Sequence, residues 1–278
     1  CVPAKVVVKA AQEAGENGVK NLIVITAGFK EVGGEGVELE KQLKALCEKY
    51  GMNMLGPNCL GFIDTATPLN ASFASAKPVP GKIALVSQSG AIGSAIMDWS
   101  KPNNIGFSKI VSLGNKGDLN EADFMEATAD DPNTNVALYY IEDVVNGSHF
   151  IKAAEKSALK TPTLVLKSGK SEAGGRAASS HTGALAGNNK AYETAFQQSG
   201  VLEVFSLSEL FELAMVFAPG RYPKADGVAI VTNAGGLGII TTDKVEEMGL
   251  TMAKISDQTQ QMLKGKLPDT ASLSILSI

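Results

Sequence analysis

The sequence predicts an α/β fold built from successive three-layer, parallel-sheet domains, and two observations carry this prediction. Short runs of β-branched and aliphatic residues alternate with longer stretches whose apolar residues recur at helical spacing. Such alternation is typical of βα units in a parallel sheet. Glycine is frequent, with 29 among 278 residues, which indicates many tight turns or sites lined by backbone.

The first predicted block covers residues 1–76. Residues 2–18 are expected to be helical, and 21–28 form a buried strand that ends in glycine. A second helix is expected over 36–51, because five apolar residues fall on one of its faces: Val37, Leu39, Leu43, Leu46 and Cys47. A short strand over 52–56 then leads into the turn GPNCLG.

A segment rich in Pro, Ser and Ala, residues 67–81, shows neither helical nor strand periodicity and marks the first domain boundary. The second block covers residues 77–219. Its expected strands are 82–87, 107–114, 136–143, 162–169 and 201–206, and its expected helices are 89–104, 120–131, 148–160, 189–200 and 207–220. The segment 218–227 separates a third, incomplete α/β block over 220–278. Because the chain opens at Cys1 without a methionine, we expect it to be a piece of a longer protein.

Composition excludes several classes of function. The formal net charge is −4 and no basic stripe is present, so a nucleic-acid partner is not expected. No apolar run reaches the ~20 residues of a membrane helix, and no signal peptide opens the chain. The three cysteines, Cys1, Cys47 and Cys59, lack CxxC spacing. They predict a reducing, cytoplasmic location without disulfides and without a metal site.

Two glycine-rich turns between a strand and a helix are candidate anion sites. The first is ALVSQSGAIG, residues 84–93, and the second is IVTNAGGLGI, residues 230–239. At each turn, unpaired N–H groups of a helix start face outward, and Ser87 and Ser89 add hydroxyl donors to the first. Close packing of helix on sheet is an equally good explanation of either turn. Neither is a Walker A loop or a good dinucleotide fingerprint, which argues against an NAD-binding protein.

The two histidines stand in different settings. His149 lies at an expected helix start beside apolar residues, which favours a surface or capping role. His181 lies among Gly, Ala, Ser and Thr, where a phosphate or a substrate can approach the ring closely. A nucleophilic imidazole is usually held by a carboxylate, and Glu142 and Asp143 end a strand at the same sheet edge. A solvated histidine and a solvated strand-end acid are the alternatives at His181 and Glu142.

Five motifs occur in an order and spacing that resemble one superfamily: GPNCLG, ALVSQSGAIG, SLGNKGDLNEADF, LYYIEDV and AASSHTGALAG. The chain resembles the α-type portion of ADP-forming acyl-CoA synthetases of the acetate–CoA ligase type, relatives of succinyl-CoA synthetase. The resemblance implies the end of a Rossmann-like CoA-binding domain over 1–76 and flavodoxin-like domains after it. It also implies that His181 is phosphorylated in each turnover and that Glu142 orients it.

Further site residues are implied by the same resemblance. Those for phosphate are Ser87, Gln88, Ser89, Gly90, Thr182 and Gly183. Those lining the substrate are Asn115 and Asp118, and those of a CoA pocket are Thr26, Ala27, Gly28, Asn58 and Cys59. Arg176 is either an additional phosphate contact or a solvated loop residue.

The resemblance also implies the substrates and partners: acyl-CoA, a short-chain carboxylic acid, phosphate, CoA, and ADP/ATP with Mg²⁺. The nucleotide would bind an ATP-grasp module, either a β subunit or a fused domain, in an oligomeric enzyme. Ala27 and Leu60 replace a Glu and a Pro of succinyl-CoA synthetases, which favours the acetate-type branch. The stretch LSILSI departs from the family pattern. The runner-up function is a CoA-binding regulatory module of a protein acetyltransferase.

Overall fold

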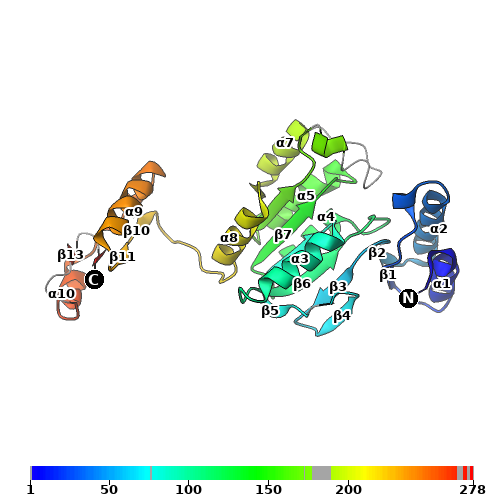
Figure 1. The fold of residues 1–278 in the computed structure, drawn as a ribbon, viewed down its shortest axis with the longest axis horizontal. Helices are drawn as coiled ribbons and strands as arrows, with labels where there is room; N and C mark the ends of the chain where they lie inside the picture. Colours follow the sequence, from blue (N-terminus) through cyan, green and yellow to red (C-terminus); the bar gives the residue numbers. More distant parts are fainter. Residues whose placement is uncertain are drawn as a thin grey trace. The chain divides into compact units, whose positions relative to one another are not determined.

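The computed structural model of the chain forms two compact units, Cys1–Gly220 and Arg221–Ile278. The structure describes residues 2–75, 77–171, 173–176, 189–267, 272–273 and 276–277. Each unit has its own elements, most of which are labelled in Figure 1. Of the helices described, none is long and apolar enough to cross a membrane.

The first unit opens with a small α/β layer. Its elements are α1 (Ala4–Glu16), β1 (Asn21–Ile23), the 3₁₀ turn η1 (Lys30–Val32), α2 (Glu35–Tyr50) and β2 (Asn53–Leu55). The strands β1 and β2 pair in parallel, and the two helices cover them. Phe29, Leu43 and Met54 are fully buried in this layer. The predicted face of α2 is therefore confirmed at Leu43 and Cys47, which lie in its core.

A seven-stranded sheet forms the rest of this unit, in the order β4-β3-β6-β5-β7-β8-β9. Its strands are β3 (Gly61–Asp64), β4 (Leu69–Ser72), β5 (Val79–Ser87), β6 (Gly106–Ser112), β7 (Val136–Ile141), β8 (Thr163–Lys167) and β9 (Leu202–Val204). The five strands from β6 to β9 are parallel and follow the flavodoxin-like order 2-1-3-4-5. The predicted α/β fold class is confirmed.

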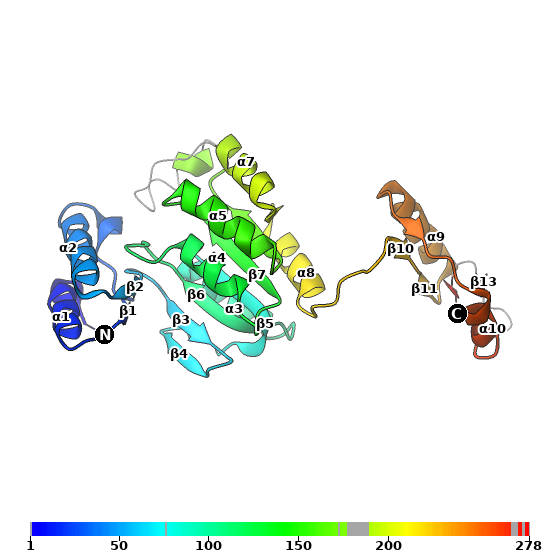
Figure 2. The same ribbon diagram turned by 180° about the vertical axis from the view of Figure 1, so that it is seen from behind.

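Helices cover both faces of this sheet (Figure 1, Figure 2). They are α3 (Gly90–Ser100), α4 (Glu121–Ala129), α5 (Gly147–Ala158), α7 (Asn189–Ser199) and α8 (Leu207–Phe217). One apolar core joins α3 and α8 to the sheet, and a second joins α4, α5 and α7 to its other face. Both cores are continuous because the parallel strands carry apolar side chains on both faces.

The hairpin β3–β4 is absent from the sequence prediction, which ended a turn at residue 61, assigned residues 67–81 to an irregular segment and gave no element to the residues between them. The structure pairs β3 antiparallel with both β4 and β6, so this hairpin extends the sheet of the second block. The two strands have only four residues each: β3 has its apolar residues Phe62 and Ile63 side by side, and the alternation of β4 is too short to stand out from the Pro/Ser/Ala-rich segment around it. The division into 1–76, 77–219 and 220–278 stays a prediction.

The second unit is small, and several apolar side chains of its helix α9 are exposed. It contains β10 (Gly227–Val228), β11 (Val231–Thr232), α9 (Gly235–Glu247), β12 (Thr251–Met252), α10 (Asp257–Lys264), β13 (Ser272–Leu273) and β14 (Leu276–Ser277). β10 pairs with β12, and β11 pairs with β14. The predicted strand before the second glycine-rich turn is thus two short strands in different sheets. On α9, Leu237, Ile239 and Ile240 are exposed.

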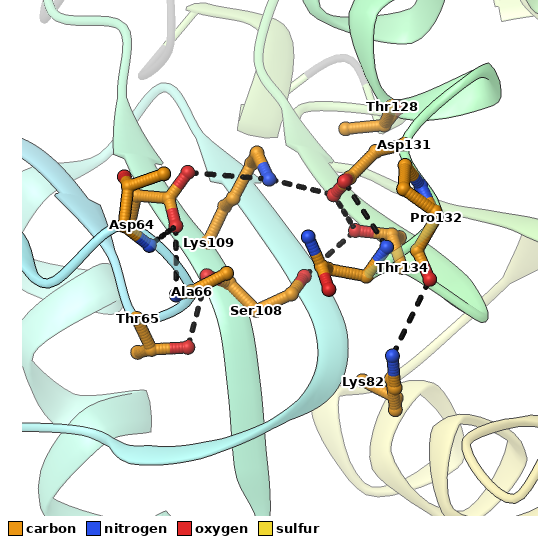
Figure 3. A network of polar contacts seen from close by, with 12 residues as sticks. Asp64, Thr65, Ala66, Lys82, Ser108, Lys109, Thr128, Asp131, Pro132 and Thr134 are labelled. Carbon is orange, nitrogen blue, oxygen red and sulfur yellow. Dashed lines mark hydrogen bonds and ion pairs between the residues drawn. The ribbon is translucent and has the colours of Figure 1, made fainter.

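A charged network ties the β3–β4 hairpin to the sheet, as Figure 3 shows. The Lys109 Nζ of β6 lies 3.3 Å from Asp64 Oδ2 and 2.6 Å from Asp131 Oδ2. Burial alone would raise the pKa of both carboxyl groups. At Asp64 the Thr67 N–H and the Lys109 ammonium reverse that effect, and at Asp131 the Lys109 ammonium and the Thr134 hydroxyl do so. Both pKa values are therefore lowered, so this stabilisation is present above about pH 4 and is lost as the pH falls below it.

We predict that Lys109→Met lowers the free energy of unfolding by about 2–4 kcal/mol at pH 7, because two largely buried carboxylates lose their cation. The difference from wild type should shrink below about pH 4, where protonation removes the charge repulsion between these carboxylates. Urea denaturation followed by fluorescence of Trp99, the one tryptophan, measures both values. The matched control is Lys82→Met, because the exposed Lys82 donates only to the Pro132 carbonyl. Equal losses in the two variants at pH 7 would contradict the prediction.

Candidate functional site

A cavity of about 730 Å³ lies at the carboxyl edge of the seven-stranded sheet. It opens between the ends of β5 and β7. The helices that follow these two strands, α3 and α5, lie on opposite faces of the sheet, so this position is the topological switch point of the strand order. Its charged and polar lining comes from both parts of the first unit: Lys30, Glu31, Asn58, Cys59, Gln88, Ser89, Ser94, Asn115, Lys116, Glu142 and Asp143. Parallel strands thus bring together residues that are distant in the sequence.

The β5–α3 turn presents backbone N–H groups rather than serine hydroxyls to this cavity. Ser87 Oγ donates to the Ser89 carbonyl at 2.7 Å and accepts from the Ser89 N–H at 3.2 Å. Ser89 Oγ caps α3 by accepting from the Ile92 N–H at 3.3 Å. Within the described part of the chain, the N–H groups of Gly90 and Ala91 donate to no protein acceptor. Both residues line the cavity, so the start of α3 offers two backbone donors to an anion.

Gln88 joins the end of β5 to the backbone that follows β7. Its Oε1 accepts from the Glu142 N–H at 2.5 Å and from the Asp143 N–H at 3.0 Å. Its Nε2 donates to the Asp143 carbonyl at 2.7 Å, and its own N–H donates to the Tyr140 carbonyl. The side chain therefore holds the backbone of Glu142 and Asp143, and Gln88 also lines the cavity. Its role in binding phosphate stays a prediction.

Sequence reasoning missed a buried ion cluster beside Glu142. The Lys116 Nζ contacts Asp143 Oδ1 at 2.8 Å, the Asp143 carbonyl at 2.8 Å and Glu121 Oε2 at 3.2 Å. The side chains of Lys116 and Glu121 are 3% and 1% exposed. Glu121 Oε1 also accepts from the Val145 N–H, so the cluster holds the loop that follows β7. A lysine inside the glycine-rich GNKGD stretch was the available signal, since it follows a strand at this edge.

Asn115 links the two parts of the first unit at the cavity. Its Nδ2 donates to Glu31 Oε2 at 2.5 Å and to Glu40 Oε2 at 2.9 Å. Burial raises the pKa of Glu31, but hydrogen bonds from Asn115 and from the N–H groups of Gly28 and Phe29 outweigh it and hold that pKa below its usual value. Glu31 is therefore ionised at neutral pH, and this wall of the cavity carries a negative charge beside Lys30.

The residues implied for CoA divide into two groups. Ala27, Asn58 and Cys59 line the cavity. Thr26 and Gly28 do not: the Thr26 hydroxyl donates to the Val2 carbonyl, and the Gly28 N–H donates to Glu31 at 2.5 Å. The buried Cys59 thiol has its pKa raised by burial to about 11, so it stays protonated at neutral pH.

Of the two residues predicted to line the substrate, one lines the cavity and the other does not. Asn115 lines the cavity, whereas Asp118 lies outside its lining. The Asp118 carboxylate accepts from the Met54 N–H at 2.8 Å and so holds the middle of β2 against this loop. The Asp118 carboxylate is thus engaged with the backbone of β2, and its role as a substrate-lining residue stays a prediction.

His181, Thr182 and Gly183 lie outside the described residues, so their assignment rests on the sequence. Their segment leaves from β8, the strand beside β7, and returns to α7. His149 lies in the first turn of α5, half-buried, where its Nε2 is 3.5 Å from Glu126 Oε1. Asn146, not His149, caps that helix, by accepting from the His149 N–H.

Comparisons with known proteins add the family. Residues 80–217 match the succinyl-CoA ligase like flavodoxin domain. The chain is 48% identical over 267 residues to acetate–CoA ligase [ADP-forming] I of Archaeoglobus fulgidus, covering 96% of this chain and 39% of that protein. It is 46% identical to the α subunit of acetate–CoA ligase [ADP-forming] I of Pyrococcus furiosus, covering 90% of this chain and 54% of that subunit.

The chain belongs to the superfamily of ADP-forming acyl-CoA synthetases.

The fold agrees with this membership. A dinucleotide-forming acetyl-coenzyme A synthetase of Candidatus Korarchaeum cryptofilum, solved in complex with phosphate and ADP, superposes with a TM-score of 0.89 and 38% identity. The match covers 99% of this chain and 60% of that one. The resemblance to this synthetase superfamily is thereby confirmed. The chain spans about 40–60% of the lengths of these relatives.

We predict that Lys116→Ala lowers the free energy of unfolding by about 3–5 kcal/mol, because it leaves Glu121 and Asp143 without their buried cation. Urea denaturation monitored by Trp99 fluorescence measures the change. Lys156→Ala is the matched control, since Lys156 forms an exposed pair with Asp130 at 3.5 Å that contributes about 0–1 kcal/mol. If Lys116→Ala lowers the free energy of unfolding no more than Lys156→Ala does, the buried cluster does not stabilise the fold as predicted.

Proposed function

We propose that the chain is the α portion of an ADP-forming acyl-CoA synthetase of the acetate–CoA ligase type. The reaction interconverts acyl-CoA, ADP and phosphate with a short-chain carboxylic acid, CoA and ATP, through a phosphohistidine at His181. The observation that carries the proposal is the common cavity: one space at the switch point is lined by the α3 start, by Glu142, and by Ala27, Asn58 and Cys59 of the first block.

The steps assign each group a task. A phosphate oxygen attacks the thioester carbonyl, the C–S bond breaks, and CoA leaves as its thiolate with an acyl phosphate remaining. A nitrogen of His181 then attacks phosphorus, and the P–O bond to the acyl group breaks to release the carboxylate. In the last step a terminal oxygen of ADP attacks phosphorus, the P–N bond breaks, and ATP forms. Glu142 holds the imidazole in one tautomer and supports its cationic form.

The charge of the phosphoryl group determines how the protein must hold it. A phosphoryl group carries a charge of about −1.5 to −2 at neutral pH. One helix end contributes only about 0.3–1 kcal/mol when exposed, or about 2 kcal/mol when partly buried. Direct hydrogen bonds from the N–H groups of Gly90 and Ala91 therefore have to add to the field of α3. Arg176 is exposed and stays a candidate of second rank.

Partners follow from the same chemistry. Among the described residues, no group of three or more His, Cys, Asp or Glu is placed to hold a metal ion. We assign ADP and its Mg²⁺ to an ATP-grasp module, as a β subunit or a fused domain of a cytoplasmic, oligomeric enzyme, because the resemblance to ADP-forming acyl-CoA synthetases implies such a module. The cavity has room for the thioester end of CoA beside Ala27 and Cys59. The alternative, a regulatory module of a protein acetyltransferase, finds no support among these relatives.

We predict that the complete protein, with its nucleotide-binding module, becomes labelled by radioactive phosphate when acetyl-CoA is supplied. The label should be acid-labile and base-stable, as expected of phosphohistidine, and His181→Asn should abolish it. His149→Asn is the matched control, because His149 is the second of the two histidines in the chain. Labelling of His181→Asn at the wild-type level would refute the relay.

We predict that Glu142→Gln slows phosphoenzyme formation by about 100-fold or more, because an amide no longer stabilises the charged imidazole. Rapid-quench measurement of the labelled protein gives the rate. Glu126→Gln is the control, since it alters the carboxylate beside the other histidine, His149. If both variants form phosphoenzyme at the wild-type rate, Glu142 has no orienting role.

A further inference from the structure

The β3–β4 hairpin brings two apolar side chains to the cavity at the sheet edge. The open end of its ladder is the pair Gly61–Ser72, so Leu60 and Phe73 stand just beyond it. The Phe73 N–H donates to the Leu60 carbonyl at 3.2 Å and holds the two residues together. Both residues line the cavity. Neither has a part in the steps of the proposed reaction.

Leu60 is the fixed member of this pair. It belongs to the apolar core, is 4% exposed, and donates its N–H to Ser112 Oγ at 2.9 Å. Its side chain lies against the first turn of α3. A Cβ atom at Gly90 would be 3.5 Å from Leu60 Cβ, and one at Gly93 would be 3.8 Å from Leu60 Cδ2. Leu60 is therefore a firm apolar surface next to the N–H groups at the start of α3.

Phe73 is the exposed member of the pair. It is 64% exposed, although phenylalanine is among the residues most often buried. The cavity that it lines has a volume of about 730 Å³, so there is space for a ligand against the ring. A ligand that covers the ring removes apolar surface from water, and this burial is favourable. Phe73 is thus placed to stabilise an apolar group of a ligand.

The surroundings of the pair suit an acid with an apolar chain. Leu60, Phe73 and Ala91 all line the cavity, and their side chains carry no charged or polar atom. The start of α3 adds the backbone N–H groups of Gly90 and Ala91, which suit the oxygen atoms of a carboxyl or an acyl phosphate group. Such an acid meets both requirements, because its oxygen atoms can face the N–H groups while its chain covers the apolar pair.

A second charge on the acid fits this cavity poorly. The charged side chains that line it, two lysines against three carboxylates, have a formal net charge of −1. Lys116 is paired with Glu121 and Asp143. Lys30 donates to the Asn115 carbonyl at 3.3 Å. Both lysines are thus engaged within the protein, and a second carboxylate would add to a negative surplus. The cavity therefore favours a monocarboxylic acid.

We propose that Leu60 and Phe73 bind the acyl chain and that Phe73 determines which chain is preferred, so that the substrate class is an aliphatic monocarboxylic acid. This inference rests on the proposed function. The chain lies on Leu60 and is covered on one side by the ring of Phe73, while the carboxyl or acyl phosphate oxygen atoms face the start of α3. A longer chain covers more of the ring, so this contact favours butanoate over acetate.

Another role of Phe73 would give a different result. The ring could instead contact CoA or another domain of the complete enzyme. In that case its removal changes the rates with all acids by one factor, whereas contact with the acyl chain makes the change depend on chain length. The ratio of kcat/KM for butanoate to kcat/KM for acetate separates the two roles, because factors common to both acids cancel.

The experiment measures initial rates of acyl-CoA formation from ATP, CoA and each acid in the complete protein with its nucleotide-binding module. We expect Phe73→Ala to lower the butanoate-to-acetate ratio by about fourfold or more, because a fully buried methylene group contributes a factor of about four and the ring covers one side of two of them. Phe73→Leu should keep most of the ratio. Phe205→Ala is the matched control, since Phe205 is 72% exposed and lies outside the cavity lining. Thermal denaturation of each variant reports folding, and Phe73→Gln replaces the Ala variant if that one does not fold.

The outcomes separate this inference from the proposed function. If wild type forms acyl-CoA and Phe73→Ala keeps the wild-type ratio, the synthetase activity stands and the role of Phe73 is refuted. An equal loss of the ratio in Phe205→Ala also refutes it, and so does a wild type that uses succinate as well as butanoate. If wild type forms acyl-CoA from none of these acids, the proposed function fails and this inference fails with it.

Discussion

The carboxamide of Gln88 is the contact on which the candidate site depends. It joins the end of β5 to the end of β7 by accepting from the Glu142 and Asp143 N–H groups and donating to the Asp143 carbonyl. At a switch point the segments that follow two neighbouring strands diverge, so their backbone groups have no partner strand. The Gln88 side chain takes the place of that strand for the N–H groups of Glu142 and Asp143. Together with the parallel pairing of β5 and β7, this side chain fixes the position of Glu142 relative to the α3 start.

Around this contact, the charged side chains that line the cavity are Lys30 and Lys116 against Glu31, Glu142 and Asp143, a formal net charge of −1. Lys116 is neutralised by Glu121 and Asp143, and Lys30 stands beside the ionised Glu31. The remaining attraction for an anion comes from backbone N–H groups. Such a site has little need of arginine, and the chain contains only two arginines in all. Weak, distributed donors suit a phosphoryl group that has to leave again for a nucleotide.

The small first layer completes the site rather than merely preceding it. Asn115, in the loop after β6, is held by Glu31 and Glu40 from that layer, and Asp118 holds the middle of β2. The same polar contacts that join the layer to the sheet therefore form one wall of the cavity. The Lys109 network fastens the β3–β4 hairpin to the sheet. Phe73, the residue after β4, also lines the cavity.

The sequence by itself determined the βα alternation, the buried strands and the switch-point turns, because periodicity and glycine placement are local properties. It also singled out His181 and Glu142, since a proton-carrying ring among small residues and an acid at a strand end are visible in the letters. Only the tertiary structure decided that Gln88 holds the backbone of Glu142 and Asp143 and that Lys116 pairs with Glu121 and Asp143. Those roles depend on which donor meets which acceptor across strands, and hydrogen-bond pairing between distant residues leaves no periodic trace in a single chain.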